Sequence, residues 1–160
     1  MGGLLFGLTY ASALGSGLTA GIFFAFSTFV ITALARLPAE QGIAAMQSIN
    51  VTVLNPLFMF VFMGTAFACV FLGIVSLNKW GTASAAYLLV GCVLYFVGSF
   101  LVTVIFSVPL NNALAAVTPG SSEGAQLWNH YLSSWVMWNH VRTIASLAAL
   151  ASFILAIRKW

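Results

Sequence analysis

The sequence predicts an all-α integral membrane protein, an up-down-up-down four-helix bundle in a single transmembrane domain over residues 1–160. Hydrophobic residues make up 62% of the chain and charged residues only 4%, whereas a soluble domain carries about 25% charged residues. The mean hydropathy is +1.08, and the apolar residues form four long runs. The net charge of +3 is small and not gathered into a patch, so we expect no nucleic-acid partner.

Four helices are expected, at about residues 4–35, 42–77, 83–117 and 124–158. The first ends at Leu37-Pro38, because the residue before a proline disfavours helical geometry. Residues 78–81 separate the second helix from the third, and residues 118–122 separate the third from the fourth. Because these breaks are short, neighbouring helices should be antiparallel.

Strongly polar residues gather at one end of the predicted bundle. The members of this group are Gln47, Asn50, Asn55, Asn111, Asn112, Asn129, His130, Asn139, His140 and Arg142. Both termini share the opposite end with Lys79, Arg158 and Lys159. The positive-inside rule then places both termini in the cytoplasm of a bacterial-type inner membrane, with the polar end facing outward.

The fourth helix carries two different faces. At 100° per residue, one arc holds Trp128, Tyr131, Trp135, Trp138, Asn139 and Arg142. The two histidines, His130 and His140, fall almost opposite to it. An arginine within a membrane bundle usually faces the interior and has a function, although snorkelling or a structural polar network would also explain Arg142. Trp128 and Trp135 could equally be interfacial anchors.

A metal site is not favoured. His130 and His140 are separated by roughly 15 Å of helical rise, and a metal lies about 2 Å from each ligand nitrogen, so the histidines of one helix cannot share an ion. Cys69 and Cys92 lie in apolar runs and are expected as buried free thiols. We predict no metal ligand and no cofactor, with copper or haem as the less favoured alternative.

Prolines and small residues shape the packing. Pro56 and Pro109 fall at comparable depth on adjacent helices, where two kinks would open a cavity in the polar half, or would only curve the helices. Small residues recur every four positions from Ala13 through Gly17 and Gly21 to Ala25. Such a ridge favours close helix packing within the chain or between chains, so the sequence is compatible with a homo-oligomer.

Four motifs in fixed order cover nearly the whole chain. They are GxxAGxFFAFS from Gly17, RLPxxxGIAAMQxIN over residues 36–50, PLNNALA from Pro109, and WxxYxxxWxxWNHVRT over residues 128–143. In this order and spacing they resemble the anthrone oxygenase-like family of small membrane proteins. The resemblance implies a four-helix fold and an oxygen-dependent oxidoreductase without a bound cofactor, acting on a lipophilic aromatic or polyphenolic substrate at the extracytoplasmic half of the bundle.

On this basis His140, Arg142 and Asn139 are the predicted catalytic residues. His140 would act as general base, while Arg142 and the asparagines would hold a phenolate or enolate. The predicted substrate-binding residues are Asn50, Asn55, Asn111, Asn112, Trp135, Trp138 and His130. Since His140 and Arg142 lie about 160° apart on the helix, one cavity must wrap the helix or include a second subunit.

Two other function classes remain open. The chain would serve as a non-enzymatic bundle if it binds a membrane lipid or hydrophobic metabolite, or supports a larger complex. It would be a redox protein if it holds copper or haem. A transporter is not favoured, because no acidic residue offers ion coupling within the predicted spans.

Overall fold

The computed structural model describes residues 2–78 and 81–159, and over these residues its regular structure is entirely helical. Four of the described helices are long and apolar enough to cross a membrane: Gly3–Ala35, Pro56–Asn78, Ala83–Ala116 and Ser122–Arg158. The predicted fold class, an all-α four-helix membrane bundle, is confirmed, and the chain is an integral membrane protein.

Two of the four spans contain π-helical segments. The first span consists of α1 (Gly3–Ala25), the π-helical segment η1 (Phe26–Val30) and α2 (Ile31–Ala35). The third span consists of α5 (Ala83–Tyr95), two π-helical segments, η2 (Phe96–Leu101) and η3 (Thr103–Ser107), and α6 (Val108–Ala116). Such widened turns are often found at functional sites, and these segments adjoin the cavity described below.

The helix expected over residues 42–77 is instead two helices, α3 (Ala39–Thr52) and α4 (Pro56–Asn78). Pro56 occupies the first position of α4, where its missing N–H would have no helical partner in any case. Asn55 caps this new start, because its Oδ1 accepts a 3.0 Å hydrogen bond from the Phe58 backbone N–H. The segment 53–55 therefore turns the chain rather than kinking one long helix.

The longest helix is α7 (Ser122–Arg158), with 37 residues. Gly120 precedes it with a φ of 88°, a left-handed conformation that glycine adopts without steric cost. The Ser121 hydroxyl then accepts a 2.9 Å hydrogen bond from the Gly124 backbone N–H and caps the helix. Glu123 in the first turn and Arg158 in the last turn complement the helix dipole.

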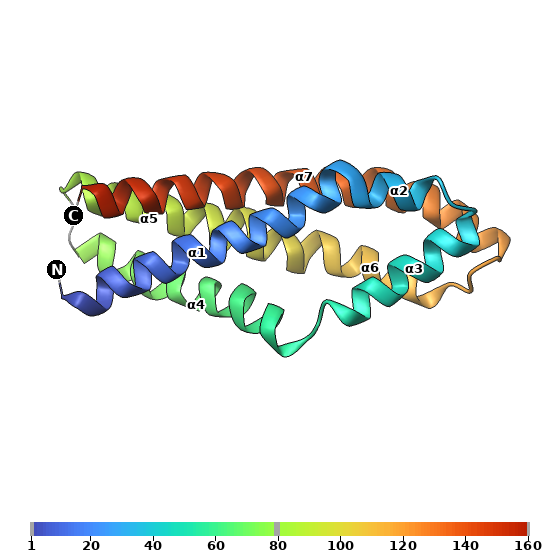
Figure 1. Ribbon diagram of the computed structural model, residues 1–160, viewed down its shortest axis with the longest axis horizontal. Coiled ribbons are helices and arrows are strands. Elements are labelled where there is room, and N and C mark those ends of the chain that lie inside the picture. The colour runs from blue at the N-terminus through green and yellow to red at the C-terminus, as the bar shows by residue number, and fades with distance from the viewer. Residues whose placement is uncertain (1, 79–80, 160) are drawn as a thin grey trace.

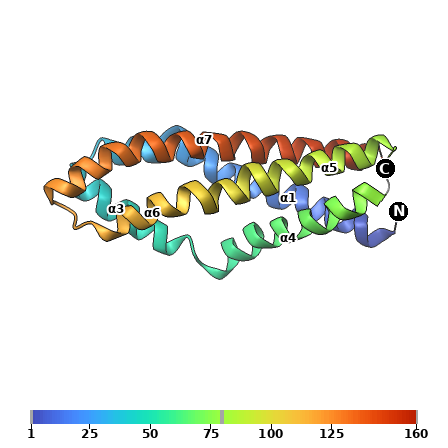
Figure 2. The same ribbon diagram turned by 180° about the vertical axis from the view of Figure 1, so that it is seen from behind.

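The helices form one elongated bundle (Figures 1 and 2). Helix α7 packs along α1 and α5, and α4 closes the bundle by packing on α1 and α5. The labelled N and C ends lie together at one end, and the α2–α3 and α6–α7 connections lie at the other. The core has two parts: an apolar cluster towards the termini, around Leu72, Leu88 and Phe153, and an aromatic cluster towards the connections, around Trp128, Tyr131 and Trp135.

The bundle is longer than the lipid core is thick. Helix α4, with 23 residues, rises about 34 Å, close to the 30 Å of hydrocarbon, whereas α7 rises about 55 Å. Exposed side chains in the first half of α7 are mostly polar, as at Asn129 and Ser133, while Ile144 and Ile154 are exposed in its second half. The end that carries α2, α3 and α6 therefore projects beyond the hydrocarbon.

Candidate functional site

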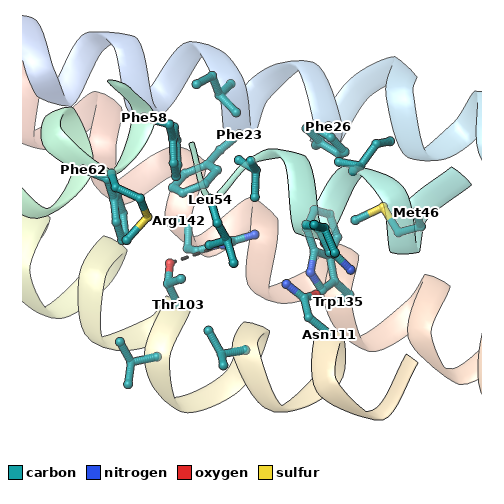
Figure 3. Close-up of a pocket in the computed structure, with 18 of the residues that line it drawn as sticks. Phe23, Phe26, Met46, Leu54, Phe58, Phe62, Thr103, Asn111, Trp135 and Arg142 are labelled. Carbon is teal, nitrogen blue, oxygen red and sulfur yellow. Dashed lines mark hydrogen bonds between the residues drawn. The ribbon is translucent and has the colours of Figure 1, made fainter. Parts of the chain in front are cut away.

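A cavity of about 440 Å³ lies inside the bundle at the level of the α3–α4 break, where the projecting end begins. Its size falls within the range of small-molecule sites. Its walls are mainly apolar and aromatic, contributed by α1, η1, α3, α4, the third span and α7. The aromatic members are Phe23, Phe26, Phe58, Phe62, Phe100 and Trp135. Figure 3 shows several of these rings surrounding the side chain of Arg142.

Arg142 is the one charged side chain among the described residues that line this cavity, and it is only 4% exposed. Its Nη2 donates a 2.6 Å hydrogen bond to Asn139 Oδ1, and its Nη1 donates a 3.2 Å hydrogen bond to Thr103 Oγ1. Thr103 in turn donates to the Ser99 carbonyl at 2.8 Å. The guanidinium is thus fixed by α7 itself and by the π-helical part of the third span.

Asn139 is completely buried and ties α7 to the first span. Its Nδ2 lies 2.7 Å from both the Phe23 carbonyl and Ser27 Oγ, and donates to each. Thr143, one turn along α7, donates to the Asn139 carbonyl at 2.8 Å and also lies 3.1 Å from Ser27 Oγ. These bonds orient the amide oxygen that holds Arg142, so Asn139 positions the arginine.

The guanidinium also lies against two aromatic faces. Its central carbon is 4.2 Å from the Phe23 ring centroid and 5.1 Å from that of Trp135. Each ring face offers a favourable cation–π contact. No carboxylate pairs with Arg142 among the described residues. The chain has only two acidic side chains, Glu40 and Glu123, and both are exposed in the loop-proximal turns of α3 and α7.

Amide side chains form the wall on the side of the projecting end. Gln47, Asn50, Asn111 and Asn112 line the cavity there. Gln47 donates to the carbonyls of Leu114 and Val117, at 2.8 and 3.0 Å, and so joins α3 to the end of α6. Tyr131 donates to Asn111 Oδ1 at 2.8 Å. The cavity therefore has a cation at one end and amides at the other.

One side of the cavity is bordered by exposed apolar residues. Val51 and Leu54, beside the α3–α4 break, are 74% and 64% exposed, and Val104 and Val108 of the third span are also exposed. Because the break begins the membrane-spanning α4, this side faces the boundary between hydrocarbon and headgroups.

The structure brings most of the predicted site residues together. Among the cavity-lining residues are the predicted Arg142, Trp135, Asn50, Asn111 and Asn112. Asn139 lies directly behind Arg142 as its hydrogen-bond partner.

The remaining predicted residues lie elsewhere. His130 and His140 are exposed and do not line the cavity. Asn55 caps α4, and the Trp138 ring stacks on Phe106 at a centroid distance of 3.6 Å. Within one chain, His140 therefore has no direct access to a molecule held against Arg142. Among the described residues, no three side chains of the types His, Cys, Asp and Glu are grouped as metal ligands would be.

Sequence reasoning missed three residues that shape the site. Phe23 carries both a ring under the guanidinium and a carbonyl bonded to Asn139. Phe23 belongs to the FFAFS motif at residues 23–27, which is the sequence signal for this position. Thr103 and Tyr131 hold Arg142 and Asn111, respectively. Thr103 lies inside an apolar run, and no sequence pattern in that run indicates that it contacts Arg142.

Fold and site together define a small membrane protein with an internal aromatic cavity built around a buried arginine. A sequence model described as anthrone oxygenase matches residues 58–152, more than half of the chain, and the chain belongs to this family. The match includes Thr103, Asn139 and Arg142, while Phe23 and Asn50 precede it. No curated protein and no solved structure matches the chain.

Proposed function

We propose that the chain is an oxygen-dependent oxidoreductase that binds a lipophilic phenolic or polyphenolic aromatic, such as a hydroxylated anthrone, as its anion in this cavity. The observation that carries the proposal is the buried guanidinium of Arg142, which no carboxylate neutralises among the described residues. Family membership supports the reaction class, and the aromatic walls support a planar substrate.

The buried charge of Arg142 favours an anionic ligand. Taking an ionised side chain out of water costs several kcal/mol unless it is paired. Hydrogen bonds to Asn139 and Thr103 and the rings of Phe23 and Trp135 offset part of this cost for Arg142. A phenolate or enolate oxygen would supply the missing opposite charge in a site of low dielectric constant, where such a pair is strongest.

The chemistry can be written without a cofactor. The benzylic methylene of an anthrone is acidic, because loss of its proton gives a delocalised enolate. That electron-rich anion reacts with molecular oxygen, and the balanced overall reaction converts CH₂ and O₂ into C=O and H₂O. The carbon loses four electrons, which oxygen gains. Arg142 would stabilise the oxyanion formed before oxygen reacts, as oxyanion-binding groups do in other enzymes.

The structure bears on the general-base role proposed for His140. Neither a carboxylate nor an imidazole is found among the described residues that line the cavity. A proton removed by His140 would have to travel around α7, since that side chain is exposed. Arg142 would therefore favour ionisation of the substrate, and a solvent water molecule at the side bordered by Leu54 and Val104 would accept the proton.

A second candidate function is a non-enzymatic bundle that binds an acidic lipophilic metabolite or lipid. It is favoured because the described residues that line the cavity include no carboxylate or imidazole base. Both candidates share the Arg142 site. They differ in whether oxygen is consumed, which the experiment below measures.

Several further expectations remain proposals. Arg158 and Lys159 are exposed at the end that holds the termini, which supports a cytoplasmic location for that end of an inner-membrane protein. Lys79, which contributed to this prediction, lies outside the described residues. The absence of a metal or haem cofactor and the formation of a homo-oligomer also stay predictions.

The test is oxygen consumption with 1,8-dihydroxyanthrone by the purified protein in detergent micelles, corrected for spontaneous oxidation in protein-free micelles. We expect Arg142→Met to lower kcat/KM by about 100-fold or more, the loss typical for removal of an oxyanion-stabilising group. Arg158→Met, which removes an exposed arginine from the same helix, is the matched control and should retain full activity. Wild-type protein that is no faster than micelles alone would contradict an enzymatic role and leave the binding candidate.

A further inference from the structure

The cavity walls contain hydrogen-bond donors that the protein itself leaves unused. Among the described residues, three buried N–H groups of cavity-lining side chains have no partner: Asn50 Nδ2, Trp135 Nε1 and Arg142 Nε. The other buried unpartnered polar atoms are hydroxyls of Ser12, Ser16 and Ser107, which do not line this cavity. Buried polar groups are nearly always paired, so three in the lining of one cavity require an explanation.

All three groups have the same polarity. An indole N–H, an amide N–H and a guanidinium N–H can only donate. A ligand that relieves them must therefore bring acceptor oxygens. Two of the three donors are on side chains without charge, and they are satisfied equally well by a neutral carbonyl oxygen.

The three donors belong to side chains that line one cavity. Trp135 and Arg142 are seven residues apart on α7, and the guanidinium carbon lies 5.1 Å from the Trp135 ring centroid. Figure 3 shows these two side chains beside the same cavity, with Phe23 and Phe26 close to them. Asn50 adds its amide from α3. A flat molecule between these rings would present its edge oxygens to the donors.

We infer that the cavity is a quinone-type site, in which Trp135 and Asn50 donate hydrogen bonds to carbonyl oxygens of a planar aromatic ligand beside Arg142. The inference deepens the proposed function and rests on it only in taking this cavity as the substrate site. It has one consequence of its own: an unsubstituted quinone, which has carbonyl oxygens and no acidic proton, binds here and competes with the substrate. The product of the proposed reaction keeps its phenols and gains a second carbonyl oxygen, so it is an inhibitor as well.

Two probes with the same aromatic ring system separate the contribution of hydrogen bonding to affinity from that of ring packing. Anthracene and 9,10-anthraquinone share the same three fused rings, and only the second carries carbonyl oxygens. Neither is charged or oxidised further under the conditions of the test. Anthracene binding is followed by its own fluorescence in detergent micelles, corrected for micelles without protein, and anthraquinone binding by displacement of anthracene.

Wild-type protein should bind anthraquinone more tightly than anthracene. In Trp135→Phe, which keeps an aromatic wall and removes the N–H, affinity for anthraquinone should fall about three- to tenfold, the effect of losing one hydrogen bond. Affinity for anthracene should not change. Trp138→Phe is the matched control, because Trp138 stacks on Phe106 outside the cavity lining, and it should bind both probes as wild type does. Asn50→Leu should weaken anthraquinone alone, by a similar factor.

Equal effects of Trp135→Phe on both probes, or no effect on either, would overturn the inference. So would a wild-type protein that binds the two probes equally. These outcomes are distinguishable from failure of the proposed function, since anthraquinone binding requires no turnover. A protein that prefers anthraquinone through Trp135 yet consumes no oxygen with an anthrone would keep this inference and lose the oxidoreductase proposal.

Discussion

Replacing Asn139 by leucine tests whether a buried amide holds the functional arginine. This substitution removes three hydrogen bonds: those to the Phe23 carbonyl and Ser27 Oγ, each 2.7 Å long, and the 2.6 Å bond accepted from Arg142. Leucine is close to asparagine in size and more apolar, so the substitution removes hydrogen bonds and leaves the packing volume nearly unchanged. The guanidinium would keep its contact with Thr103 but lose its shortest one.

The magnitude follows from the contacts. Interhelical hydrogen bonds in membrane proteins contribute about 0.6 kcal/mol on average, and a hydrogen bond to a charged group about 1.5–3 kcal/mol. Two of the first kind and one of the second sum to about 3–4 kcal/mol. For a chain of this size we expect Tm to fall by about 5–15 °C, and anthrone oxidation to fall at least tenfold because Arg142 is no longer held.

The assay is thermal unfolding in detergent followed by circular dichroism, with oxygen consumption measured well below the lower Tm. Asn129→Leu is the control, because Asn129 is exposed on the same helix, and it should change Tm by less than about 2 °C. An Asn139→Leu protein with the Tm and the rate of the wild type would refute the claim that this amide positions the arginine.

Two further predictions concern His140 of α7 and Gly98, a residue of η2 that packs against α7. His140→Ala should lower the oxidation rate less than about threefold, because the imidazole is exposed outside the cavity lining; a loss as large as that of Arg142→Met, measured side by side, would restore His140 as the base. A Cβ added at Gly98 would lie 2.6 Å from the Ala145 Cβ, so Gly98→Ala should destabilise the bundle by about 1–3 kcal/mol. Ala145→Gly should restore most of that loss in the double variant, and an additive effect of the two substitutions on Tm would show that this contact is not tight.

The sequence predicted the large features because they depend on strong, local signals. Long apolar runs and short breaks predict helices wherever lipid is the solvent, and the spans agree closely for the first, third and fourth helices. The face of Arg142 also followed from simple geometry, since helical periodicity placed Trp135 and Asn139 beside it. The opposite face, with both histidines, is indeed exposed.

Most of what failed to follow from the sequence depends on contacts between distant segments. Pro56 could kink one helix or start another, and only the Asn55 cap decides for the second. The recurring small residues predicted a packing ridge, yet Gly21 has open space beside it, while Gly91 and Gly98 make the close approaches to α7. Trp138 shares an arc with Trp135, but its ring pairs with Phe106 instead. The partners of Gly91, Gly98 and Trp138 are all distant in sequence, whereas the Asn55 cap is a local contact.

The central claim is that Arg142 binds the substrate as an anion, and the ionisation of a bound phenol tests it most directly. The phenol and phenolate forms of 2-hydroxyanthraquinone differ in visible absorption, so its ionisation can be followed during a pH titration with and without protein. A unit charge about 4 Å away at an effective dielectric constant of about 20 favours the anion by about 4 kcal/mol, so ionisation should move about one to three pH units lower on the wild-type protein. On folded Arg142→Met the shift should vanish. A ligand that binds the wild type yet ionises at the same pH as in empty micelles would contradict the account.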